Sequence, residues 1–347
     1  MKNAFIPVFS YSSDIGFAGG AVFGHYDYRG NIRPFRKYIE ASAVASTKGY
    51  VKVNGIYEQA RSFGTNIRSK VKVDFDRLAE ENFFGIGNNT TFEKEKWEND
   101  YYFFKSIAVG GDYQARMPVY QNGDSQFDLI AGLGLEYQIP YVLLETSVFR
   151  ETMPNGSKGG FIGYLNAGFV WENRDNEFDP ARGNHVAFQL AAAPSLTSEY
   201  ALVTYRLDLR QYIRFFDQVT LAGRLAGNHA AGDVPFWRLP TLGNDLTLRG
   251  YPLNRFKGNS SISWNLELRT WILRFPDYDI KLGGQLFTDF GRVFTREDNL
   301  KDLFNDYKRT FGVGGALSVF SPDFILRGDI GFSEDVSRIY IGVGYTF

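Results

Sequence analysis

The side chains that most often perform covalent chemistry are scarce in this sequence, and no pattern assembles them. None of the three histidines (His25, His185 and His229) stands in a recognisable Ser/His or Asp/His arrangement of the kind hydrolases need. The sequence has no cysteine, which excludes thiol catalysis, disulfides and thiolate-bound metals. No metal-ligand spacing and no phosphate-binding Gly-rich loop is found. We therefore expect a protein that is not an enzyme and carries no cofactor.

One basic residue nevertheless stands out by its surroundings. Arg249 lies between Leu248 and the pair Gly250-Tyr251, in the polar stretch 239–259, LPTLGNDLTLRGYPLNRFKGN. This stretch is punctuated by Gly and Pro for about twenty residues, and structureless stretches of that length are usually functional or disordered. We interpret it as a loop that folds back inside a barrel.

The elements that must position this loop are strands. About sixteen segments alternate apolar and polar residues with a period of two, and no segment of similar length shows a helical repeat. In 260–272, for example, Ile262, Trp264, Leu266 and Leu268 alternate with Ser263, Asn265, Glu267 and Arg269. In the last segment, 338–347, the residues Ile339, Ile341, Val343, Tyr345 and Phe347 are predicted to share one face. The pattern predicts an all-β protein with even strand number.

Two all-β architectures fit such alternation. A soluble sandwich turns its polar face to water and packs its apolar face against a second sheet. A membrane barrel turns the apolar face to lipid and the polar face to the lumen. The long segments and the mixed charges of their polar faces favour a 16-stranded antiparallel transmembrane β-barrel, which occupies residues 1–347 as a single domain.

Composition agrees with this interpretation. Aromatic residues make up 17% of the chain, and such residues form girdles at both membrane interfaces of barrels. The formal net charge of -1 argues against a nucleic-acid partner, because phosphate neutralisation needs a basic excess. No apolar run is long enough for a transmembrane helix. The residues expected in the lumen are close to balanced in charge, which predicts internal ion pairs around a plug. They are the basic Arg206, Arg210, Arg224, Arg269, Lys281 and Arg327 and the acidic Glu136, Asp208, Glu267, Asp289 and Asp329.

The first segment, 4–11, contains Pro7, which cannot donate to a strand ladder. Two interpretations remain open. Pro7 either weakens the seam at which the first and last strands close the barrel, or it lies outside the paired region.

Several stretches resemble the barrel domain of the BamA-like outer-membrane assembly and secretion superfamily, also called the bacterial surface antigen family. The most specific are the loop motif Leu248-Arg249-Gly250-Tyr251 and the strand motif Phe287-Thr288-Asp289-Phe290-Gly291. Weaker matches are Phe84-Gly85-Ile86-Gly87-Asn88, Arg174-Asp175-Asn176 with Asp179-Pro180 and Gly183, and the C-terminal Gly342-Val343-Gly344-Tyr345-Thr346-Phe347. In order, they cover the chain from about residue 80 to its end.

The resemblance implies sixteen strands, with the Arg motif in an inward-folded loop between strands 11 and 12. It further implies that Arg249 reaches the lumen and pairs with Asp289. Periodicity supports this pairing, because Asp289 shares the polar face of its strand with Lys281 and Gln285. Glu267, on the polar face of the preceding strand, is a second candidate partner. The alternative is that Arg249 is a solvated loop residue.

The C-terminal residues Gly342, Gly344, Tyr345 and Phe347 resemble the signal by which the assembly machinery recognises unfolded outer-membrane proteins. Relatives that insert or secrete proteins carry N-terminal periplasmic POTRA domains. Here strand-like sequence begins at Ala4, so we expect none of these domains in the chain. This departure puts the capture of client proteins in doubt.

The resemblance implies a bacterial outer-membrane protein that contacts lipid and inserts or translocates unfolded protein clients. Two other functions stay open. The barrel could be a membrane anchor, with a possible homodimer, for a covalently linked passenger domain, or it could be a small-solute channel.

Overall fold

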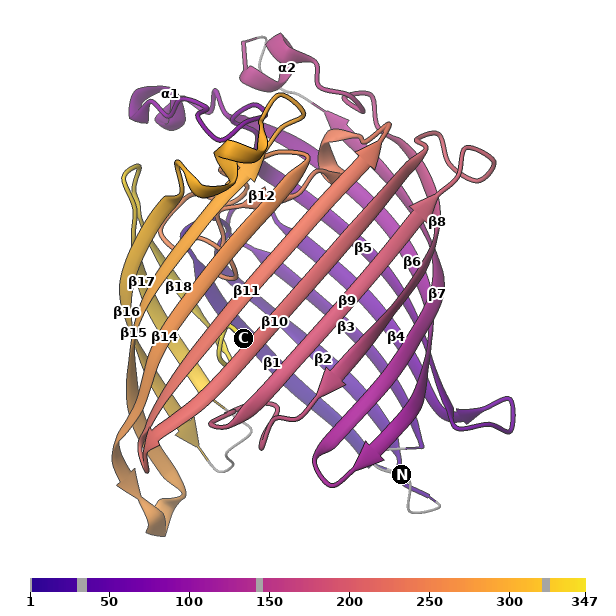
Figure 1. Cartoon of the computed structure of the whole chain (residues 1–347), viewed down its shortest axis with the longest axis vertical. Coiled ribbons are helices and arrows are strands. Elements are labelled where there is room, and N and C mark those ends of the chain that lie inside the picture. The colour runs from indigo at the N-terminus through magenta and orange to yellow at the C-terminus, as the bar shows by residue number, and fades with distance from the viewer. Residues whose placement is uncertain (1, 30–35, 142–145, 320–324) are drawn as a thin grey trace.

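The computed structural model describes residues 2–29, 36–141, 146–319 and 325–347. Within these residues sixteen antiparallel strands form a closed barrel, in which the first strand pairs with the last (Figure 1). The predicted 16-stranded β-barrel is confirmed, and the sandwich alternative is wrong. The barrel strands are β1 (Lys2–Ser12), β2 (Gly16–Asp27), β3 (Lys37–Ser46), β4 (Val51–Ser62), β5 (Ile67–Asn82), β6 (Phe103–Asn122), β7 (Ser125–Tyr141), β8 (Gly160–Glu172), β9 (Gly183–Ala193), β10 (Leu202–Phe216), β11 (Val219–Gly232), β14 (Ser260–Phe275), β15 (Ile280–Phe294), β16 (Lys308–Val319), β17 (Ile325–Phe332) and β18 (Ser337–Val343).

The connections hold only short elements. They are α1 (Lys94–Glu98), α2 (Val148–Thr152), the 3-10 helices η1 (Phe236–Arg238), η2 (Pro276–Tyr278) and η3 (Leu300–Phe304), and a two-stranded sheet of β12 (Thr241–Leu242) and β13 (Phe256–Lys257). Figure 1 shows α1 and α2 at the end of the barrel opposite the N-terminus. We call this end the loop rim. Among the described residues, no helix is long and apolar enough to cross a membrane.

The barrel wall is apolar outside and polar inside. On β14 the side chains of Trp264, Leu266 and Leu268 are exposed, whereas the intervening Asn265 and Glu267 are buried. A soluble β-protein buries its apolar face, so this arrangement is the inverse and suits a barrel surrounded by lipid. Because the period is two, the same alternation that builds the outer surface aims the polar residues at the lumen.

The seam between β1 and β18 is short. In the described part of the chain, these strands share two register pairs, Tyr11–Ile341 and Ser12–Tyr340, whereas β1 shares eleven with β2. Pro7 pairs with Ala21 of β2 and lies outside the part of β1 that pairs with β18, as the second interpretation held. Among the residues that the structure describes, the edge of β1 from residue 2 to residue 10 therefore has no strand partner on the β18 side.

The last strand ends earlier than predicted. β18 stops at Val343, and Gly344 has a φ of +83°, a left-handed conformation that turns the chain away from β1. The prediction that Tyr345 and Phe347 share the outward face of Ile339 is wrong. Phe347 is buried in the lumen against Tyr212 and Ala222.

The physical reason for this turn is a basic residue on the lumen wall. Arg269 of β14 donates from Nη2 to the main-chain oxygen of Phe347 at 2.9 Å. Its guanidinium also lies 4.1 Å from the ring centroid of Tyr345 and 5.1 Å from that of Phe347. Cation–π contacts of this kind favour the aromatic residues inside the barrel over a lipid-facing position.

Candidate functional site

The connection between β11 and β14, the eleventh and twelfth barrel strands, enters the lumen. This loop, residues 233–259, carries η1, β12 and β13, and Figure 1 shows part of it between the barrel walls. Its tip is the motif Leu248-Arg249-Gly250-Tyr251. Leu248, Arg249 and Tyr251 are each at most 1% exposed. We call residues 233–259 the lumen loop.

The structure brings Arg249 together with Asp289 and Glu267. Arg249 donates to Asp289 from Nε at 2.9 Å, from Nη2 at 2.7 Å and from its main-chain nitrogen at 3.1 Å. Its Nη1 donates to Glu267 Oε1. All three side chains have zero exposure. Asn265 completes the set by donating to Asp289 Oδ1 at 2.9 Å and to the main-chain oxygen of Thr247 at 2.7 Å.

The other two positions of the strand motif also face the loop tip. The Phe287 ring lies under the Arg249 guanidinium, with 3.5 Å between Cζ and the ring centroid. Gly291 leaves room for Leu248, because a Cβ at Gly291 would come within 3.3 Å of Leu248 Cδ1. The spacing Phe287-x-Asp289-x-Gly291 thus follows from the strand period, which places all three residues on the lumen face.

Glycine at position 250 has two physical causes. Its φ is +108°, and a Cβ there would lie 2.8 Å from the Phe332 backbone of β17. The close approach is mutual, since a Cβ on Gly331 would lie 2.7 Å from the backbone of Arg249. Main-chain groups of Gly250 bond to Tyr340 Oη at 3.2 Å and to Ser333 Oγ at 3.0 Å.

The lumen loop also reaches the strands that form the seam. Tyr251 Oη donates to Glu334 at 3.2 Å, and Arg255 Nε donates to Asp335 at 2.5 Å, both in the β17–β18 turn. On the other side of the seam, the main-chain nitrogen of Leu253 donates to Asp14 in the β1–β2 turn at 3.0 Å. One loop therefore connects the first hairpin, the last hairpin and the wall formed by β14 and β15.

The buried charges around the tip are balanced. Burial disfavours the charged form of Arg249, but Glu267 and Asp289 outweigh burial and raise the pKa of its guanidinium. Lys257, elsewhere in the loop, is different: burial lowers its pKa to about 8, and its ammonium donates to the Phe236 carbonyl at 3.0 Å. Since Arg249 stays charged, the tip acts as a permanent ionic clamp and contains no nucleophile–base pair.

The lumen wall forms further ion pairs, although one expected member stands apart. Arg210 and Arg224 both bond to Asp208, at 2.9 and 2.8 Å. Arg269 pairs with Glu267, Arg327 pairs with Asp329, and Glu136 pairs with Arg238 of η1. Arg206 makes no ion pair or hydrogen bond within the described residues, and across that same part of the chain no acidic or histidine cluster could hold a metal.

The weaker motifs lie at opposite ends of the barrel. In the stretch Phe84–Asn88, Gly87 bridges to Lys257 of the lumen loop, and the Asn88 amide donates to the Asp306 carbonyl at 2.9 Å. The stretch 174–183 connects β8 with β9 at the opposite end from the loop rim, where Asp179 accepts from Trp271 Nε1 at 3.0 Å. Gly342 lies on β18, next to the turn at Gly344.

Several residues of the site are absent from the sequence-based prediction. Asn265 could have been found, because it lies two residues before Glu267 on the same polar face. The sequence does not indicate the roles of Tyr340, Ser333 and Arg255. Their partners lie at least 80 positions away, and the contacts depend on how deeply the lumen loop enters the barrel.

The family follows from the sequence itself. A family model described as the Omp85 superfamily domain matches residues 50–347. The chain belongs to the Omp85 superfamily. A search among curated proteins found no match.

Solved structures agree with this Omp85 barrel in fold. BamA from Haemophilus ducreyi, in a form lacking POTRA domains 1-3, matches with a TM-score of 0.68 at 13% identity, covering 99% of this chain and 70% of that one. CdiB from Escherichia coli matches with a TM-score of 0.62 at 12% identity, covering 98% and 62%. CdiB from Acinetobacter baumannii matches with a TM-score of 0.57 at 11% identity, covering 99% of this chain and 59% of that one. At these identities the likeness concerns the fold.

Proposed function

We propose that this Omp85 barrel resides in the bacterial outer membrane, where it inserts or translocates other proteins by opening the seam between β1 and β18. The observation that carries the proposal is the shortness of that seam, which two register pairs close in the described part of the chain. We expect no covalent chemistry in this process, because the lumen loop is held by an ionic clamp and opening the seam only separates two strands. The partners would be membrane lipid and an unfolded protein client.

The free edge of β1 suits such a client. Residues 2–10 extend for about 30 Å at the usual rise per residue, and their edge has no β18 partner among the described residues. An unpaired strand edge is a template for pairing with another chain. A client strand could therefore add to β1 through main-chain hydrogen bonds, which makes the interaction tolerant of client sequence.

A reversible lock on the seam tests the proposal. The natural chain has no cysteine, so Tyr11→Cys with Ile341→Cys introduces a single possible disulfide at a register pair. The assay follows assembly of an unfolded barrel client into liposomes containing the protein, read by gel mobility before and after heating. Oxidation should reduce the assembly rate at least about tenfold, and reduction should restore it, since separating the pair would require breaking a covalent bond.

The matched control locks a ladder that is already complete. Phe5→Cys with Phe23→Cys joins a register pair of β1 and β2, and its oxidation should leave the rate unchanged. Full client assembly by the oxidised seam variant would contradict the proposal. If instead the wild-type protein assembles no client, a large and steady ion conductance would favour the small-solute channel, and the absence of both activities would favour a passenger anchor.

A further inference from the structure

We infer that the lumen contains a binding site for a small oxyanion of the phosphate type, built around Arg206 of β10 and Gln189 of β9. A cavity of about 540 Å³ lies between the β9–β11 wall and the lumen loop. Its volume is well above the size of one such anion with its water molecules. Nothing in the seam mechanism uses this cavity, so the inference is independent of the proposed function.

The cavity has an excess of positive charge. Its charged lining residues are the basic Arg206, Arg224, Arg238 and Lys257 and the acidic Glu81 and Asp208. The acids that contact them do not remove the excess, because Asp208 is shared between Arg224 and Arg210, while Glu136 pairs with Arg238 and also accepts a hydrogen bond from Trp237. An excess of two positive charges therefore remains around the cavity, and walls of low dielectric strengthen its potential.

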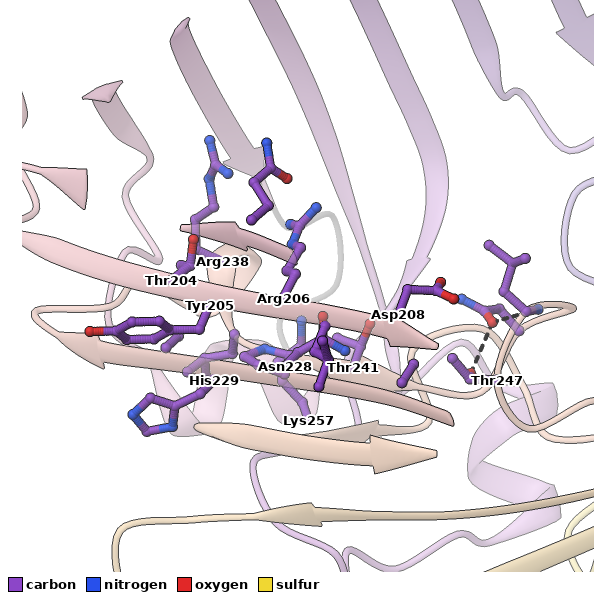
Figure 2. A pocket seen from close by; sticks show the side chains of 18 of the residues that line it. Thr204, Tyr205, Arg206, Asp208, Asn228, His229, Arg238, Thr241, Thr247 and Lys257 are labelled. Carbon is purple, nitrogen blue, oxygen red and sulfur yellow. Dashed lines mark hydrogen bonds between the residues drawn. The ribbon is translucent and has the colours of Figure 1, made fainter. Parts of the chain in front are cut away.

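Arg206 is the centre of this excess. Its side chain has no hydrogen-bond or ion-pair partner in the part of the chain that the structure describes, although every neighbouring lumen arginine has one. Figure 2 shows the side chains of Arg206 and Arg238 directed to the same side of the strands, with Tyr205 and His229 lying apart from them. Arg206 is exposed to the lumen, so a dissolved anion can reach its guanidinium, and an anion bound there would offset its repulsion from Arg238.

The neutral neighbour of Arg206 supports an oxyanion. Gln189 is its register partner on β9, lines the same cavity, and likewise makes no side-chain hydrogen bond within the described residues. The amide supplies N–H donors, and the guanidinium supplies a planar fork that matches two oxygens of a phosphate or sulfate. Chloride would be attracted by the charge but cannot accept two parallel hydrogen bonds on separate oxygens, so the site should prefer oxyanions.

The test measures binding of inorganic phosphate to the purified full chain in detergent micelles. Titration calorimetry at constant ionic strength, with chloride replaced by phosphate, should show saturable binding to the wild-type protein. Arg206→Gln should weaken it at least about tenfold, the expected loss for a charge-assisted contact. Arg206→Lys keeps the positive charge without the planar pair of donors, so its affinity for phosphate should lie between those of the wild type and Arg206→Gln.

The matched control is Lys70→Gln, which removes a lumen-facing cation from β5, away from this cavity, and should bind phosphate as the wild type does. Heat-modified gel mobility confirms that each variant is folded. Failure of the wild-type protein to bind phosphate, equal binding of chloride, or unchanged binding by folded Arg206→Gln would each overturn the site. If that variant does not fold, Gln189→Leu replaces it, and the loss of one neutral donor should weaken phosphate binding about threefold.

Discussion

Arg249 joins the lumen loop to the barrel wall, because each of its three guanidinium nitrogens donates to Asp289 or Glu267 and the Phe287 ring lies under the group. Desolvating three charges is costly, so the net contribution of this cluster to stability is not simply the sum of its bonds. Its effect is to define one position for the loop. Asp289 receives three hydrogen bonds from a single residue, and a slip of one position along the loop would remove all of them.

Arg249→Gln should therefore destabilise the protein strongly. The variant leaves Glu267 and Asp289 buried without their cation, and breaking a buried pair in this way costs about 3–5 kcal/mol. The free energy of unfolding is measured by urea titration in liposomes, followed by tryptophan fluorescence. Arg182→Gln, in an exposed turn, is the control and should change stability by less than about 0.5 kcal/mol. Equal stability of the two variants would contradict the clamp.

Gly250→Ala separates backbone conformation from close packing. Gly250 and Gly64 both have positive φ, at +108° and +69°, but a Cβ at Gly64 would meet nothing within 4 Å. Gly64→Ala should cost about 1 kcal/mol, the left-handed penalty alone. Gly250→Ala should cost clearly more in the same unfolding measurement, because it also pushes the loop tip off β17. Equal losses would show that the tip can move at no cost.

At the scale of single residues, the family resemblance and the two-residue period of the strands predicted much of the site. The resemblance named Leu248 to Tyr251 and Asp289, and the two-residue period placed Glu267 on the lumen face. That Arg206 has no partner within the described residues could not be predicted in the same way. Charge balance along the sequence suggested that it would be paired, but pairing depends on which rotamers reach across neighbouring strands, and Asp208 is occupied by two other arginines.

At the scale of strands, the alternation of apolar and polar residues was sufficient to predict a strand and its two faces wherever one face met lipid and the other met the lumen. It predicted sixteen strands and the position of the long loop between the eleventh and twelfth. It failed at β18, where Tyr345 and Phe347 continue the outward pattern but lie inside. Hydrophobicity alone cannot separate lipid from an aromatic pocket, and the decisive Arg269 lies 78 residues from Phe347.

Gly344→Val should shift the end of β18 toward β1. The substitution disfavours the left-handed turn, and continuing the register of Tyr11–Ile341 would place Thr346 opposite Ile6. In a background of Ile6→Cys and Thr346→Cys, the yield of disulfide under mild oxidation should rise about fivefold on adding Gly344→Val.

A second cysteine pair controls for the chemistry of oxidation. Ile6→Cys with Val22→Cys joins an existing register pair of β1 and β2, so its yield should be high with or without Gly344→Val. If the 6–346 yield stays at its starting value while this control forms normally, the inward turn does not depend on the glycine.

For the whole molecule, closure of the barrel does not mean an open channel. The lumen loop and the C-terminal residues lie inside the barrel, and the aromatic cluster of Phe83, Phe104, Phe149 and Phe236 packs at its loop rim. A general diffusion porin keeps an open aqueous channel through the barrel, which such contents would obstruct.

Single-channel recordings in planar bilayers should accordingly show small and unsteady currents for the wild-type protein. Arg249→Gln should increase the frequency of large openings several-fold, because the loop tip loses its attachment to β14 and β15. Arg182→Gln should behave as the wild type. Large, steady currents in the wild-type protein would mean that the loop does not restrict the path for ions.

The short final strand has a consequence for the surrounding bilayer. β18 has seven residues, which at the usual rise and a tilt near 40° span a height of about 18 Å, less than the apolar band of about 25 Å that barrels present. The bilayer next to β18 must therefore become thinner, or else its acyl chains contact main-chain groups of β1 that have no β18 partner among the described residues. Hydrophobic mismatch is thus concentrated on one side of the circumference, and a bilayer of short-chain lipids should relieve it.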